Sequence, residues 1–145
     1  AHVAGGPAVP HRAFGHSEID GQWQRTDQSS TSAVLGDGGI YSNLDDLAHW
    51  DTVLYDDRLL SDASRAQAFS PQSTVVGEGY EAGYGFGWRI SGDRQWHSGE
   101  SIGFRNVMIR WPQQRLMVAL LSNRDDPPPH ALALEIATLF LEDGK

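Results

Sequence analysis

The chain has 145 residues, of which 39% are hydrophobic, and this is enough for one domain with an apolar core. Its formal net charge of -8 at pH 7 disfavours binding to nucleic acid or to an anionic membrane. No apolar run reaches the roughly 18 residues that a membrane-spanning helix needs. The absence of cysteine excludes disulfides and thiolate chemistry, and the only lysine is the last residue, Lys145.

The beginning of the chain combines irregular segments with one hairpin signal. Residues 1–10 are rich in Gly, Ala and Pro and have no periodicity, which predicts an irregular lead-in. Asp20-Gly21 is a turn pair that accepts positive φ, so a small hairpin is expected, with arms around 13–15 and 22–24. The glycines between 36 and 39 predict a bend.

Two helices are expected next. Ser42 is a good N-cap, and Asp45 three residues later completes a capping-box pattern. One apolar face follows at helical spacing, formed by Leu44, Leu47, Trp50 and Leu54. Ser61 could cap a second, shorter helix that runs to Phe69 and ends before Pro71.

The second half of the chain changes from helical to alternating periodicity. Residues 75–84 are rich in glycine and aromatic residues and are predicted to form a loop. Alternation then predicts an antiparallel meander of three to four strands, over 86–90, 95–97, 104–111 and 116–121. After three prolines, a final helix over 130–141 is expected to cover the sheet through Leu132, Ile136, Leu139 and Phe140. The fold class is therefore α+β.

Four short landmarks occur in a fixed order along this predicted fold. They are Gly38-Gly39-Ile40-Tyr41-Ser42 leading into Asp45-Asp46-Leu47; Tyr84-Gly85-Phe86-Gly87-Trp88; His97-Ser98-Gly99 followed by Gly103-Phe104; and Val118-Ala119-Leu120-Leu121-Ser122-Asn123 before the last helix. Together they resemble the C-terminal portion of the penicillin-recognising serine hydrolases, meaning class C β-lactamases, DD-peptidases and related esterases.

The resemblance implies roles for four consecutive residues. His97 would take the basic position of the family's third motif, and the Ser98 hydroxyl would contact a substrate carboxylate or carbonyl. Gly99 would stand where a side chain would block the ligand. The backbone N–H of Glu100 would be one of two oxyanion-hole donors, and one such donor typically lowers the barrier by about 3 kcal/mol.

The chain also departs from the family pattern. The family's nucleophile lies in Ser-x-x-Lys, but the residue three positions before Lys145 is Glu142. Tyr41-Ser42-Asn43 matches the family's Tyr-x-Asn motif, yet it lies downstream of where the catalytic tyrosine belongs, and we interpret it as a coincidence. We therefore expect residues 1–145 to form a single domain that is the C-terminal part of a larger serine hydrolase domain, and to be inactive alone. Whether the chain should be called an enzyme stays open.

Several alternatives also stay open. The same scaffold could be a non-catalytic ligand- or protein-binding module. A metal-binding domain is a third interpretation, although the six histidines show neither H-x-x-x-H nor H-E-x-x-H spacing, and we predict no cofactor and no metal. The expected partners are a small-molecule or peptide acyl substrate and a second copy or exchanged strand at the edge formed by 116–121. The resemblance is compatible with a periplasmic or extracellular location, but neither compartment nor substrate follows from the sequence.

Overall fold

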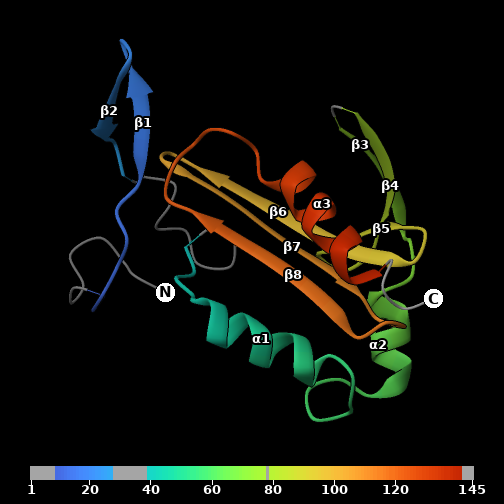
Figure 1. The fold of residues 1–145 in the computed structure, drawn as a ribbon. Coiled ribbons are helices and arrows are strands. Elements are labelled where there is room, and N and C mark those ends of the chain that lie inside the picture. Colours follow the sequence, from blue (N-terminus) through green and yellow to red (C-terminus); the bar gives the residue numbers. More distant parts are fainter. Residues whose placement is uncertain (1–8, 28–38, 78, 142–145) are drawn as a thin grey trace.

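A computed structural model describes residues 9–27, 39–77 and 79–141 of the chain (Figure 1). Its elements, in chain order, are β1 (His16–Ile19), β2 (Gln22–Arg25), α1 (Leu44–Val53), α2 (Asp62–Ala68), β3 (Ser73–Gly77), β4 (Tyr80–Tyr84), β5 (Arg89–Ser91), β6 (Arg94–Ser101), β7 (Phe104–Trp111), β8 (Leu116–Ser122) and α3 (His130–Leu141).

The main sheet is an antiparallel meander in which each strand pairs with the next strand along the chain, in the order β3-β4-β5-β6-β7-β8. One face packs against α3, because Ile109 on β7 and Ala133 on α3 share the buried core cluster. Arg110 leaves the opposite face and bonds Asp51 on α1. The α+β class is confirmed, and the helices lie on both sides of one sheet (Figure 1).

The sheet is larger than predicted because residues 75–84 do not form a loop. They lie in the β3–β4 hairpin, in which Val75 pairs with Ala82 and Val76 with Glu81. The glycine content that suggested a loop has local uses in the hairpin. Gly79 has a positive φ of 75° beside the turn, and a side chain at Gly83 would collide with the ring of Pro71. The sheet therefore has six strands in place of the expected three to four.

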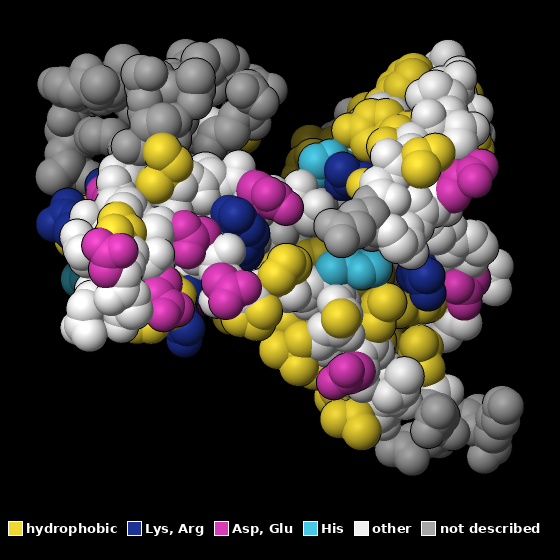
Figure 2. Space-filling view, turned by 90° about the horizontal axis from the view of Figure 1, so that it is seen from above, with side chains coloured by type: hydrophobic (Ala, Val, Ile, Leu, Met, Phe, Trp, Pro, Cys, Tyr) yellow, Lys and Arg dark blue, Asp and Glu magenta, His cyan; other side chains and the backbone are white. Residues whose placement is uncertain are grey.

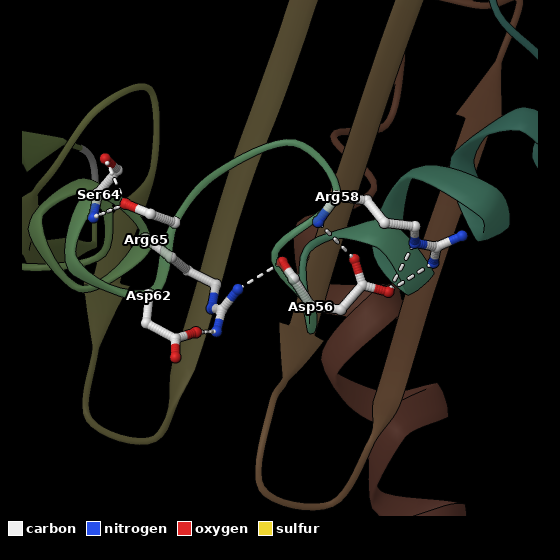
Figure 3. A network of polar contacts seen from close by, with 6 residues as sticks. Asp56, Arg58, Asp62, Ser64 and Arg65 are labelled. Carbon is white, nitrogen blue, oxygen red and sulfur yellow. Dashed lines mark hydrogen bonds and ion pairs between the residues drawn. The ribbon is translucent and has the colours of Figure 1, made fainter.

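The first two helices begin close to their predicted positions. The N-cap of α1 is Asn43, one residue after the predicted Ser42, and its side-chain oxygen accepts a hydrogen bond from the Asp46 N–H at 2.9 Å. The prediction that Ser61 caps α2 is confirmed, with a 3.2 Å hydrogen bond from the Ser64 N–H. Between these helices Asp56 binds Arg58, and Arg65 donates to the Asp56 carbonyl (Figure 3).

The predicted hairpin turn at Asp20-Gly21 is confirmed, but the first arm lies three residues later than expected, at β1. Residues 13–15 instead lead to a junction with the main sheet. A Cβ at Gly15 would lie 2.6 Å from the ring of Phe104, and the His16 N–H donates to the carbonyls of Gly103 and Asn123. Most of the predicted lead-in (1–8) and most of the predicted bend (36–38) lie outside the described residues.

The bounds predicted for the last helix are confirmed, but only Ile136 of its four predicted packing residues lies against the core. Leu132, Leu139 and Phe140 are 51%, 67% and 64% exposed, whereas Ala133 and Ala137 are almost fully buried. Small alanines let α3 approach the sheet closely, and the large side chains that fill this interface come from the strands, chiefly Trp96, Ile109 and Trp111. Figure 2 shows hydrophobic side chains gathered on the α3 side of the molecule.

A buried ion pair joins the other face of the sheet to the helices. Arg110, 1% exposed, places Nε 2.7 Å from Asp51 Oδ1 and Nη1 3.1 Å from Gln95 Oε1. Its guanidinium lies 4.6 Å from the ring centroid of Tyr55 and 5.4 Å from that of Phe69. This arrangement ties α1 and α2 to the centre of the sheet.

Removing one partner of this pair should strongly destabilise the fold. We expect Asp51→Ala to lower the free energy of unfolding by about 3–5 kcal/mol, because it leaves the guanidinium of Arg110 buried without its counter-charge. Urea denaturation followed by circular dichroism measures the effect. The control is Asp56→Ala, which removes an exposed pair with Arg58 and should change stability little. Equal effects of the two substitutions would contradict this account.

Candidate active site

The tripeptide predicted at the end of a strand lies within an eight-residue strand. On one side of β6, His97 pairs with Met108, Ser98 with Val107 and Gly99 with Asn106 of β7. The pairing continues to Ser101, so the backbone of the tripeptide is held by a continuous ladder. Residues 97–99 therefore lie within a strand and not in a loop.

The other side of β6 is covered only at its beginning. β5 pairs with Arg94, Gln95 and Trp96 and then ends. From His97 to Ser101, no further strand of the described residues lies along this outer side. An extended ligand could therefore reach the backbone of β6 there, in the way that an added strand pairs with a sheet edge.

His97 is half-buried, and its Nε2 lies 3.1 Å from the hydroxyl of Tyr84. Burial lowers the pKa of His97 below 6.5, the nearby positive charge of Arg89 lowers it further, and a hydrogen bond with the Ser98 backbone acts in the opposite direction. The imidazole is therefore neutral at pH 7, with one nitrogen able to accept a proton. Tyr84 begins the landmark Tyr84-Gly85-Phe86-Gly87-Trp88, and no sequence signal linked it to His97. The structure brings these two landmarks together through this contact.

The remaining residues of the motif face an open space. Ser98 is half-buried, whereas Gly99 and Glu100 are exposed. A Cβ built at Gly99 would meet no atom of the described structure within 4 Å. The carboxylate of Glu100 lies 3.8 Å from Arg105 Nε, an exposed contact across the strand pair. The described part of the fold therefore does not require glycine at position 99.

The Tyr-x-Asn match at 41–43 has a local structural explanation. The Asn43 side chain accepts from the Asp46 N–H and donates to the Asp46 carboxylate at 3.1 Å, so both its polar atoms serve the α1 cap. The ring of Tyr41 lies 5.0 Å below the guanidinium of Arg12. This use of Asn43 agrees with interpreting the match as a coincidence.

An apolar pocket of ≈ 370 Å³ lies apart from the tripeptide, between α1, α2 and the β4–β5 connection. Its lining is formed by Trp50, Leu54, Leu60, Ser64, Gln67, Ala68, Phe69, Phe86 and Trp88. Four aromatic residues that lie close together in the sequence, Tyr80, Tyr84, Phe86 and Trp88, are thus divided among three places. Phe86 and Trp88 line this pocket, Tyr80 packs on Trp96, and Tyr84 bonds His97.

The described ranges contain neither a metal-ligand cluster nor a membrane-spanning helix. Within residues 9–27, 39–77 and 79–141, no three His, Asp or Glu side chains converge as metal ligands would. None of the helices in this part of the chain has both the length and the apolar character needed to cross a membrane.

The neutral state of His97 predicts how stability depends on pH. Folding lowers the pKa of both His97 and His130 below 6.5, mainly through burial. Above pH 6.5 both histidines are neutral in the folded and in the unfolded chain, so they do not lower the free energy of unfolding there. As the pH falls below 6.5, the unfolded chain takes up protons that the folded chain resists, so stability falls until the folded pKa values are passed.

Urea midpoints measured from pH 8 to pH 5 should therefore decrease with falling pH. The decrease should be smaller in His97→Gln, which removes one of the two imidazoles. A flat profile in the unsubstituted chain would show that neither imidazole is kept neutral by the fold.

Two comparisons with known proteins identify the family of the chain. A family model described as Beta-lactamase matches residues 1–141. Over 106 residues the chain is 34% identical to Penicillin-binding protein 4* of Bacillus subtilis (strain 168), an alignment covering 70% of this chain and 23% of that relative. The chain thus spans about a quarter of the length of the relative it matches. With a meander sheet, a covering C-terminal helix and a family match over nearly its whole length, the chain belongs to the β-lactamase family.

Proposed function

We propose that this chain supplies one wall of the acyl-transfer site of a serine hydrolase. The observation that carries the proposal is the outer side of β6 from His97 to Ser101, which is held rigidly by β7 and is open beside Gly99. The serine nucleophile and its lysine would come from a part of the hydrolase domain outside these 145 residues, because Lys145 has no serine three positions before it. The chain alone is then inactive.

In this proposal each residue of the motif has a separate role. Attack on an acyl carbonyl builds negative charge on its oxygen, and the N–H of Glu100 on a fixed strand would stabilise that charge without reorganising. The Ser98 hydroxyl would bind a carboxylate or carbonyl of the substrate. His97, neutral at pH 7 and bonded to Tyr84, would offer a lone pair or an N–H to a reacting group and would not add a fixed positive charge.

The substrate class is an acyl compound that can lie extended along β6, such as a peptide, an ester or a β-lactam. The relative's name describes it as penicillin-binding, which supports testing a β-lactam first. A non-catalytic binding module is the second candidate. The observation that favours it is the apolar pocket between α1 and α2, which lies apart from the tripeptide and could hold a ligand without any chemistry.

The activity test uses both the chain and the product of its full reading frame. The purified chain should turn over neither nitrocefin nor short p-nitrophenyl esters, and the full-length protein should turn over at least one. In the full-length protein, Gly99→Val should lower kcat/KM by roughly 100-fold or more, because the new side chain fills the space where the ligand would lie. Its Cβ meets nothing within 4 Å, so unfolding should be little affected.

The matched control is Glu81→Val, which places the same side chain at an exposed position on β4 and should leave kcat/KM unchanged. Turnover by the chain alone that is abolished by His97→Ala would contradict the proposal. A full-length protein that binds a penicillin but turns over no acyl compound would favour the binding module.

We also propose that the outer edge of β8 is paired in solution. β8 is the last strand of the sheet, and residues 116–121 read Leu-Met-Val-Ala-Leu-Leu, with no charge or proline to discourage pairing. The candidate partners are the strand of a second copy, the 1–10 lead-in or an exchanged segment.

Sedimentation velocity and amide hydrogen exchange test this pairing. We expect slow exchange for all amides of residues 117–120, with either a dimer or a monomer whose lead-in covers the edge. Deleting residues 1–10 should speed this exchange only if the lead-in is the partner. A strict monomer with fast exchange at alternate residues of β8 would show that the edge is open.

A further inference from the structure

Two arginines and a histidine gather on the α3 side of the sheet. Arg89 lies with its guanidinium 4.9 Å from the ring centroid of Trp96 and 5.6 Å from that of Tyr80. The ring of His130 lies 4.3 Å from Trp96. Arg94 lies two residues before Trp96 on β6, so its side chain leaves the same face of the sheet, and its charge and that of Arg89 both lower the pKa of His130. We call Arg89, Arg94 and His130 the cationic cluster.

Several nitrogens of the cationic cluster lack an acceptor. Nε and Nη1 of Arg89, Nε of Arg94 and Nε2 of His130 are shielded from solvent and have no hydrogen-bond partner among the described residues. Neither arginine forms an ion pair with a carboxylate in the described ranges, whereas the buried Arg110 pairs with Asp51. A shielded donor without a partner destabilises the fold, and the cost is larger when the donor is charged.

The aromatic rings account for only part of this arrangement. A guanidinium above a ring face is attracted by the negative charge of that face. The ring, however, accepts nothing from the N–H groups that point along the guanidinium plane. Two arginines that both lower the pKa of one histidine also repel each other. The rings explain where Arg89 lies, and an anion would explain why two arginines share one place with a histidine.

We propose that the cationic cluster binds a small oxyanion, the carboxylate or phosphate group of a ligand. A guanidinium presents paired N–H groups that match the oxygens of either group. His130 is the first residue of α3, so the positive end of the helix dipole adds to the same field. All three side chains are half-buried, which leaves them within reach of a ligand from solvent.

The cationic cluster and the candidate active site lie in different places, although Arg89 is close enough to lower the pKa of His97. Trp96 and His97 are neighbours on β6, so their side chains leave opposite faces of the sheet. Trp96 packs in the core under α3, beside the cationic cluster, whereas the open space of the candidate active site lies along the outer side of β6 from His97 onward. The proposal therefore stands whether or not the hydrolase proposal does.

The test is an NMR titration of the chain with inorganic phosphate and, separately, with acetate, each compared with sodium chloride at equal ionic strength. Saturable shifts should appear at the side chains of Arg89, Arg94 and His130. The pKa of His130 should rise on binding, because the anion offsets the charges that lower it. The pKa of His97 should rise too, since Arg89 contributes to lowering it. Comparing phosphate with acetate shows which oxyanion the site accepts.

Substitutions make the assignment specific. Arg94→Met should weaken binding at least tenfold, and Arg89→Lys should weaken it while keeping the charge and the fold. Arg58→Met is the control, because that arginine is exposed and paired with Asp56, and it should bind as the unsubstituted chain does.

Two results would overturn the proposal. Sodium chloride could reproduce the shifts, which would reduce the effect to screening. Alternatively, Arg94→Met could bind phosphate and acetate as well as the unsubstituted chain does.

Discussion

The structure depends on an unequal pairing of β6. One side of this strand is hydrogen-bonded to β7 over seven residue pairs, from Gln95 to Ser101, whereas the other side meets β5 over three. The long ladder fixes the position of every backbone group from His97 onward. The short one leaves their outer side uncovered by any strand of the described residues. Rigidity on one side and access on the other are the two conditions that a preorganised binding wall needs.

The two faces of the sheet hold β6 and β7 in place by different means. On one face, Ala133 and Ala137 bring α3 close enough for Trp96 and Ile109 to be almost fully buried, and hydrophobic burial is the main stabilising force there. On the other face, the ion pair of Arg110 with Asp51 joins α1 to the middle of β7. A buried pair of this kind contributes positional specificity more than net stability. β6 and β7 are therefore held in place by contacts on both faces of the sheet.

The sequence predicted the features that depend on short-range signals. The hairpin turn at Asp20-Gly21, the cap at Ser61 and the bounds of α3 after three prolines each follow from a few neighbouring residues, and all were confirmed. The order of the four landmarks predicted the family, which the matches to known proteins confirmed. The roles of residues 97–100 stay predictions, although the structure places them on one rigid strand.

Features that depend on long-range pairing were missed or predicted wrongly. The glycines of 75–84 suggested a loop, but partners across the hairpin make it β3 and β4. The apolar periodicity of α3 marked Leu139 and Phe140 as buried, because it could not show that two alanines set the distance to the sheet. No local pattern predicts that β5 pairs with β6 only as far as Trp96, or that Tyr84 contacts His97. Both features depend on how separate strands align.

Amide hydrogen exchange along β6 tests the central claim most directly. If β7 holds this strand and its outer side is open, alternate amides between residues 97 and 101 should exchange slowly, as those of β7 do, and the amides between them should exchange fast. Fast exchange at every one of these residues would show that the tripeptide is mobile. Slow exchange at every one would show that its outer side is already covered, and either result would contradict the account.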